Sequence, residues 1–312
     1  MVGDFFSAVG DVLSSETTYS SGWRLAVALA FVAVGEWIAE RAGTINISVE
    51  GSMLAGAFAA AMGYDASGSV AVGLLIGAAA GLLVGAVQAH FSHNLTANQF
   101  VVGLTLNILV LGLASFLNSS LKPETATAHV FEVPGLVEIP LLGPALFGQP
   151  WPLYLLYPLV PLAWWLVYRT RWGLEVRAVG ENPQAADVSS IDVNARRRQA
   201  IYFAGVTSGL GGGYLLLGQV GWFEDAIVGG QGFIAIAAVI FGGWTLRGAM
   251  LGCLLFGSAN SFRLSLPAVG HPLNSELLSS LPFVLTICVM ALFAHRTREP
   301  QSLARPFIRG LR

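Results

Sequence analysis

The residues whose side chains could bind a ligand or transfer a proton are polar residues that lie inside long apolar segments. Glu36 and Glu50 are carboxylates in such segments, and Asn46 and Asn107 are amides in the same kind of setting. A carboxylate at the centre of a membrane-spanning helix costs about 2.5–3.5 kcal/mol on insertion scales, so it normally faces a cavity or a hydrogen-bonding partner. These four residues are therefore candidates for lining a polar passage or for joining helices.

Two roles are open for Glu50. Asn46 lies four residues earlier, so on one continuous helix the two side chains would share a face. They could line a passage together, or Glu50 could clamp two helices through Asn46 or through a backbone amide. For Glu36, close to one membrane surface, and for Asn107, a hydrogen bond between helices is the favoured interpretation.

The sequence offers little that would support catalysis. Lys122 is the only lysine, and it lacks the preceding glycines of the P-loop pattern G-x-x-x-x-G-K-[ST]. The five histidines are dispersed, and Cys253 and Cys288 stand in separate apolar runs, so neither a metal site nor a disulfide framework is indicated. We expect no enzyme active site and no cofactor bound by this chain. If ATP drives its function, ATP-Mg must bind to a separate ATPase.

Composition defines the class of protein. The chain has 312 residues, of which 54% are hydrophobic and 11% are charged, and its mean hydropathy is +0.67. These values predict an integral membrane protein. The net charge of −2 gives no indication of nucleic-acid binding, because the basic residues concentrate in one loop and in the C-terminal tail.

The apolar segments predict a single membrane domain over residues 1–312, with nine crossings and an uncertainty of one or two. The segment at residues 232–244 would cover only about 20 Å as a helix, so we expect it to be a broken helix, a re-entrant helix or a thin span. All candidate spans are residues 22–38, 44–63, 68–90, 98–118, 151–167, 200–217, 232–244, 248–262 and 277–294.

Charge predicts the orientation. Residues 169–199 hold six of the 16 Lys and Arg residues, and the C-terminal tail holds five more. Loops rich in Lys and Arg stay on the cytoplasmic side, so this loop and the tail are expected there. Residues 121–150 carry one base and three acids and are expected on the outside.

Within the basic loop, Glu181-Asn182-Pro183 predicts the start of a helix. Asn182 is suited to the N-cap position and Pro183 to the first helical position. Ala185 and Ala186 continue this short helix, which we expect to lie along the membrane surface and to dock a partner.

Small residues predict a close helix contact. Gly73, Gly77, Gly81 and Gly85 recur every four residues, so they form one face of the span at residues 68–90. Such a face lets another helix backbone approach closely.

Four sequence blocks resemble permease subunits of ABC importers for simple sugars and nucleosides. Residues 40–51 (ERAGTINISVEG) resemble the pattern E-R-x-G-x-x-N-I-x-x-E-G, and residues 103–107 (GLTLN) resemble G-L-x-L-N. Residues 179–186 (VGENPQAA) are similar to the cytoplasmic coupling segment V-G-x-N-P-x-A-A. Residues 232–244 match G-F-x-A-I-A…F-G-x-W, which is typical of the nucleoside branch.

This resemblance implies a type II importer fold: an all-α polytopic bundle of about eight to ten transmembrane helices, with broken or re-entrant helices at the translocation path. It implies a multi-pass subunit in the cell membrane of a prokaryote, with a cytoplasmic C-terminus and nucleosides as the favoured substrates. The implied partners are an ABC ATPase subunit, a second homologous or identical permease subunit, an extracytoplasmic substrate-binding lipoprotein and the lipid bilayer.

The resemblance also assigns candidate roles. The residues expected to couple to the ATPase are Gly180, Glu181, Asn182, Pro183, Ala185 and Ala186. The resemblance places Asn46, Glu50 and Asn107 in membrane-embedded motifs without saying whether they touch substrate. From their own chemistry, Asn46, Glu50, Asn107 and Phe233 are the residues that we expect near the substrate pathway. A nucleoside would offer hydroxyl donors to a carboxylate and a flat base to an aromatic ring.

Other functions stay open. Simple-sugar and branched-chain amino-acid permeases share the general layout. A proton-coupled secondary transporter would use Glu36 or Glu50 as a proton carrier and would need no ATPase. A structural or assembly subunit would keep the coupling surface but would tolerate loss of the polar groups inside the membrane.

Overall fold

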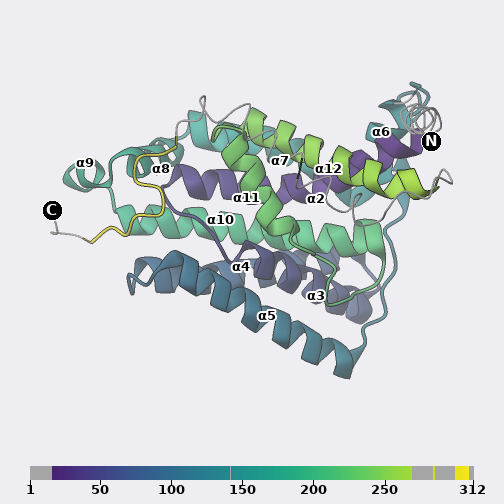
Figure 1. The fold of residues 1–312 in the computed structure, drawn as a ribbon, viewed down its shortest axis with the longest axis horizontal. Helices are drawn as coiled ribbons and strands as arrows, with labels where there is room; N and C mark the ends of the chain where they lie inside the picture. The colour runs from purple at the N-terminus through teal and green to yellow at the C-terminus, as the bar shows by residue number, and fades with distance from the viewer. Residues whose placement is uncertain (1–15, 141, 269–283, 285–298, 309–312) are drawn as a thin grey trace.

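The computed structural model describes residues 16–140, 142–268, 284 and 299–308. This part of the chain is a helical bundle with one small sheet (Figure 1). The apolar segment expected at residues 277–294 falls outside these ranges except for Val284, and so do Cys288 and the tail arginines other than Arg305.

Five helices of the described residues are long and apolar enough to cross a membrane. Three are single elements: α2 (Glu16–Arg41), α4 (Val70–His93) and α5 (Gln99–Leu121). Two are composite: η1 (Trp151–Leu155) with α7 (Leu156–Arg169), and α10 (Val193–Tyr214) with the π-helical η2 (Leu215–Val220). Helices α3 (Val49–Ser67), α11 (Gln231–Phe241) and α12 (Leu246–Ala268) complete the bundle. The prediction of an all-α polytopic membrane protein is confirmed.

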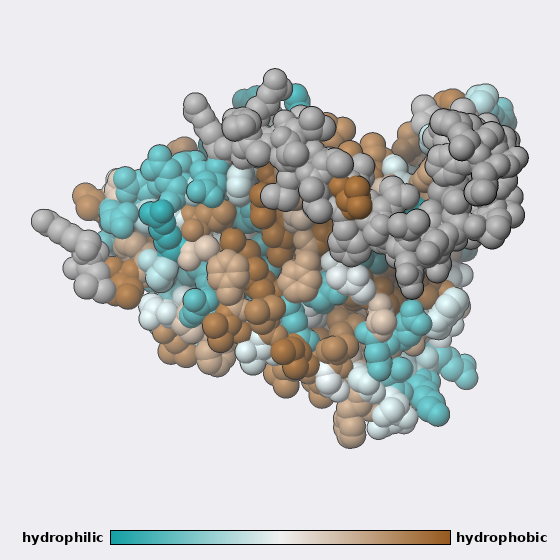
Figure 2. Space-filling model, in the orientation of Figure 1, coloured by the Kyte–Doolittle hydropathy of each residue, from teal (hydrophilic) through white to brown (hydrophobic). Residues whose placement is uncertain are grey.

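Helix α2 is the core of the bundle. Every residue from Ala26 to Glu40 is buried, because α2 packs against α7, α10, α11 and α12. Helix α5 lies at the edge and presents large apolar side chains outward, including Ile108 and Phe116. An outward apolar surface is what a lipid environment requires. Figure 2 shows apolar residues across the middle of one face and hydrophilic residues toward its ends.

The second apolar segment is not a continuous helix, which corrects one expectation. Helix α3 begins at Val49, and residues 42–48 form an irregular connection after α2. We call residues 42–48 the break. Asn46 lies in the break and therefore does not stand one helical turn before Glu50.

The polar segment contains more helix than expected. Besides α9 (Pro183–Val188), it holds α8 (Arg171–Glu181), and α10 begins at Val193 rather than near residue 200. Each start has a side-chain cap: Thr170 Oγ1, Asn182 Oδ1 and Asp192 Oδ1 accept from the amides of Gly173, Ala185 and Ala195 at 3.1, 3.0 and 2.9 Å. Only the Asn182 cap was recognised in the sequence.

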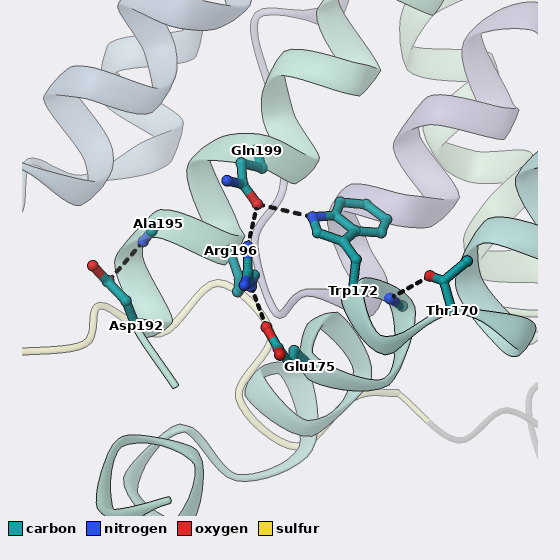
Figure 3. Close-up of polar contacts among 8 residues, drawn as sticks. Thr170, Trp172, Glu175, Asp192, Ala195, Arg196 and Gln199 are labelled. Carbon is teal, nitrogen blue, oxygen red and sulfur yellow. Dashed lines mark hydrogen bonds and ion pairs between the residues drawn. The ribbon is translucent and has the colours of Figure 1, made fainter. Parts of the chain in front are cut away.

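Surface contacts hold α8 onto α10 (Figure 3). Arg196 of α10 pairs with Glu175 of α8 and donates to Gln199 Oε1, which also accepts from the indole of Trp172 at 2.8 Å. The polar segment is thus a folded unit at one end of the bundle.

The segment at residues 121–150 contains a short antiparallel sheet, although no strand was expected there. Strands β1 (Val130–Glu132) and β2 (Gly148–Pro150) pair with Phe131 opposite Gln149. Helix α6 (Leu142–Phe147) lies between them in sequence. In Figure 1, α6 lies at the opposite end of the bundle from α8 and α9.

Helix α4 packs closely on α3 and α10 through Gly73, Gly77, Gly81 and Gly85. A Cβ atom added to Gly81 would lie 2.3 Å from the carbonyl oxygen of Gly205, and one added to Gly77 would lie 2.7 Å from that of Gly56. Neither distance leaves room for a side chain, because backbone atoms form the opposing surface.

We therefore expect Gly81→Leu to lower stability in detergent by at least about 1–3 kcal/mol, the usual cost of an overpacked core. The measurement is thermal unfolding of the purified protein. Gly112→Leu is the control, because a Cβ at Gly112 on α5 meets nothing within 4 Å. Equal melting temperatures for the two variants would show that the face containing Gly81 tolerates bulk and is not a tight contact.

Candidate functional site at the break between two helices

In the break at residues 42–48, the first three amides still donate to carbonyl oxygens of α2, but the regular helical pattern ends there and the following backbone groups need other partners. Inside a membrane protein such groups need partners from the surrounding helices. Glu36 Oε1, on α2, accepts from the amide of Asn46 at 2.8 Å. Gln99 Oε1, at the start of α5, accepts from the amide of Ile45 at 3.0 Å. Side chains on two helices therefore take the place of helical hydrogen bonds.

Asn107 joins α5 to the end of the break and to the first turn of α3 by hydrogen bonds. Its Oδ1 accepts from the amide of Gly51 at 2.8 Å, and its Nδ2 donates to the carbonyl oxygen of Ile47 at 2.9 Å. Gly103, one turn earlier on α5, permits this approach, since a Cβ there would lie 2.4 Å from Ile47 Cβ. The G-L-x-L-N block thus supplies both the space and the amide for one interhelical contact.

Glu50 caps the N-terminus of α11. Its Oε1 accepts from the amide of Gly230 at 2.7 Å, and its Oε2 accepts from the amide of Gly232 at 2.8 Å. The free amides and the helix dipole make a helix N-terminus favourable for a negative charge. Gly230 precedes the helix with φ 86°, which favours glycine. A Cβ on Gly232 would lie 2.8 Å from Glu50 Oε2, so glycine also lets the two helices meet.

The other end of α11 is held from α2. The indole of Trp37 donates to the carbonyl oxygen of Trp244 at 2.9 Å, and the indole of Trp244 donates to the Glu40 carboxylate. Trp244 has φ 54°, an uncommon value for a residue with a large side chain. Residues on both sides of the break therefore fix both ends of the short helix α11.

The four pathway candidates have different surroundings. Asn46 is completely buried, and its Oδ1 accepts from Ser48 Oγ at 2.7 Å. Glu50 and Asn107 are half-buried and bind backbone groups through their polar atoms. Phe233, in the first turn of α11, is 40% exposed. The structure thus brings Glu50 to the start of the helix that carries Phe233, whereas Asn46 serves the break.

A cavity of about 250 Å³ lies beside the start of α11. Its lining combines the apolar side chains of α2 and α12 with Gln231, Asn260 and Arg263. Gly229 and Gln231 flank Gly230, whose amide binds Glu50. The Glu50 contact therefore positions one wall of a partly polar cavity.

The coupling candidates divide into two sets. Glu181, Asn182 and Ala185 are exposed, whereas Gly180, Pro183 and Ala186 are buried. Ala186 packs with Val179 and Val193. Sequence reasoning did not single out Val188, which is 87% exposed at the end of α9. Val188 therefore adds an exposed apolar side chain to the same short helix that carries the exposed Ala185.

Further residues of the site were missing from the sequence interpretation. His93 Nε2 lies 2.9 Å from Thr44 Oγ1, and that hydroxyl also donates to Gln99 Oε1. Arg197 is fully buried and donates to the carbonyl oxygen of Ala42 at 3.2 Å. No local sequence pattern predicts these contacts, because the residues that form them are far apart in the chain.

The sequence also matches known proteins. A family model described as the branched-chain amino acid transport system permease component matches residues 18–290. The nucleoside ABC transporter permease protein NupC of Lactococcus lactis is 35% identical over 289 residues, which cover 88% of this chain and 91% of the relative. The guanosine ABC transporter permease protein NupQ of Bacillus subtilis is 32% identical, with 92% and 95% covered. A putative glucose ABC transporter permease protein, TsgC13 of Haloferax volcanii, is 33% identical, with 91% and 93% covered.

These matches extend over the break, α5, α9 and α11, the elements that carry the four sequence blocks. The resemblance to ABC permeases is thereby confirmed, and the chain belongs to the family of branched-chain amino acid transport system permease components, the multi-pass membrane subunits of ABC transporters.

Proposed function

We propose that this chain is the permease subunit of an ABC importer for nucleosides in the cell membrane of a prokaryote. The observation that carries the proposal is the full-length similarity to two permeases named for nucleoside and guanosine transport. The block around α11 and Trp244, which resembles the nucleoside branch, supports the same substrate class.

A simple sugar is the second candidate substrate. The putative glucose permease of Haloferax volcanii covers 91% of this chain at 33% identity, nearly the same level as the nucleoside relatives. The half-buried Glu50 and the exposed Phe233 suit either class, because sugars and nucleosides both carry hydroxyl donors and an apolar ring face.

The energy for transport comes from a separate subunit. Without a P-loop lysine this chain has no site of that kind for ATP, so we propose that ATP-Mg binds to a partner ATPase and that the permease has no ATPase site of its own. Helix α9 is the proposed contact, since Ala185 and Val188 face outward from it. A second permease subunit and an extracytoplasmic lipoprotein complete the importer.

The proposed orientation places α8, α9 and residues 299–308 in the cytoplasm. The arginines of this end satisfy the positive-inside rule. The opposite end of the bundle contains the two-stranded sheet of β1 and β2 and carries Glu124, Glu132 and Glu138. In the proposed orientation this end faces the lipoprotein.

The test of the substrate is uptake into proteoliposomes that contain the permease with its ATPase, second permease and lipoprotein. We expect ATP-dependent accumulation of radiolabelled guanosine or adenosine that an uncoupler does not abolish. Accumulation of glucose or leucine instead would assign another substrate class. Uptake driven by a pH gradient without ATP would assign a secondary transporter.

Glu50→Gln tests the role of the carboxylate. Glutamine keeps the shape but has one acceptor oxygen, so it cannot bind both amides at the start of α11. Hydrogen bonds to charged groups are worth about 1.5–3 kcal/mol, so we expect uptake to fall at least about ten-fold. The control is Glu16→Gln, which removes the same charge from an exposed position at the start of α2. Wild-type uptake by an assembled Glu50→Gln complex would remove Glu50 from the transport site.

Assembly separates the two interpretations of Glu50. If the residue only clamps helices, Glu50→Gln will lower the yield of assembled complex in proportion to uptake. If it positions the cavity wall that the substrate meets, assembly will stay normal while uptake falls. Size-exclusion chromatography of the purified complex gives this measurement.

Ala185→Trp tests the coupling surface. Because Ala185 is exposed on α9, a large side chain there is expected to leave the fold intact but to block ATPase contact and reduce uptake about ten-fold or more. Ala186 is unsuitable, since it is buried against Val179 and Val193. Ala79→Trp, the same replacement at an exposed position in the middle of α4, is the matched control. Normal coupled uptake by Ala185→Trp would place the ATPase contact elsewhere.

A further inference from the structure

A buried arginine lies at the end of the bundle where α8 and α9 are found. Arg197 of α10 has no exposed surface, although it stands among arginines of a polar segment. Its guanidinium donates from Nε to Ala42 O at 3.2 Å, from Nη1 to Arg305 O at 2.7 Å and from Nη2 to Ser302 Oγ at 3.1 Å. A buried charge is tolerated only where hydrogen bonds surround it, so these contacts specify the path of the chain.

Ser302 links Arg197 to the end of α8 by hydrogen bonds. Its Oγ accepts from Arg197 and donates to the carbonyl oxygen of Gly180 at 2.6 Å, and its amide donates to the same oxygen at 3.0 Å. The amide of Ala304 donates to the carbonyl oxygen of Gly43 at 3.2 Å. Residues 299–308 therefore bind both the break and Gly180, which lies near the end of α8 and three positions before the start of α9.

The same segment touches α9 itself. Phe307 packs on a small apolar cluster formed by Val179 of α8, Ala186 of α9 and Val193 of α10. This cluster is separate from the main core, so it is the apolar support of α9 within the described chain. The C-terminal segment thus supplies part of that support.

Helix α8 packs directly against the end of α2 and the start of the break. A Cβ on Gly180 would lie 2.0 Å from the carbonyl oxygen of Arg41, the last residue of α2, and 3.2 Å from the amide nitrogen of Gly43 in the break, so the backbones are in direct contact. Packed backbones and a buried guanidinium resist independent displacement, because separating them would open a void and leave a charge without partners.

We propose that residues 299–308 form a strap that joins α9 to the break through Ser302 and Arg197, so that the two move as one body. The proposal rests on the proposed coupling of α9 to an ATPase. A displacement of α9 would then pass through Gly180 and Ala42 to the break, and through Glu50 to α11 and its cavity. Packed side chains and hydrogen bonds can carry coupling between two sites, and the described residues form a continuous series of such contacts from α9 to the break.

Two variants remove the strap contacts to different degrees. Ser302→Ala deletes the hydroxyl that bridges Arg197 and Gly180 but keeps the small volume, so the protein is expected to fold. Arg197→Gln deletes the charge and most of its hydrogen bonds. Arg198→Gln is the matched control, because Arg198 is one residue further along α10 and donates to Asn94 instead of the strap.

The first measurement is hydrogen exchange of the whole complex in detergent. We expect the amides of residues 183–190 and 299–308 to exchange about five-fold faster or more in Ser302→Ala than in the wild type, and to be unchanged in Arg198→Gln. Unchanged exchange in both Ser302→Ala and Arg197→Gln would overturn the strap. This measurement requires no transport activity, so it stays decisive even if the substrate proposal fails.

The second measurement is the number of substrate molecules transported for each ATP hydrolysed in proteoliposomes. A strap that transmits movement predicts a ratio at least about five-fold lower in Ser302→Ala, with ATP hydrolysis maintained. Faster exchange of α9 with an unchanged ratio would show that the segment only stabilises the fold and would overturn the coupling role. Absence of nucleoside uptake in the wild type would contradict the substrate proposal, not the strap.

Discussion

The need to satisfy free backbone amides at the break is the constraint on which the rest of the structure depends. Between α2 and α3 the amides of Ile45 and Asn46 and the carbonyl oxygen of Ile47 have no partners of the regular helical kind. Glu36, Gln99 and Asn107 provide partners for these groups from α2 and α5. Their positions in turn require close helix contacts, such as the one that Gly103 allows. The polar residues inside the membrane therefore maintain a specific irregular backbone.

This arrangement gives α11 a fixed place. Glu50 follows the break and caps one end of α11, while Trp37 and Glu40 precede the break and hold Trp244 at the other end. The position of a short helix held in this way depends on the conformation of the break. That property suits a permease, in which a small conformational change at one surface must alter a cavity deeper in the membrane.

Local sequence signals predicted local structure well. Asn182 and Pro183 predicted the start of α9, and the short apolar segment predicted the half-helix α11. Contacts between distant residues could not be predicted, because no local pattern shows that Arg197 binds Ala42 or that Glu50 binds Gly230. The prediction that Asn46 lies on a continuous helix was wrong for the same reason. Its neighbours in the sequence are apolar and compatible with a helix, but partners on α2 and α5 stabilise an irregular backbone there.

Side chains of neighbouring helices hold the break in its irregular form, and hydrogen exchange of residues 45–51 in the purified protein can measure this. Asn107→Ala is compared with Asn118→Ala, the same change about three turns further along α5. We expect slow exchange in the wild type and in Asn118→Ala, and much faster exchange in Asn107→Ala. Fast exchange in the wild type, or slow exchange in Asn107→Ala, would show that these side chains do not stabilise the break.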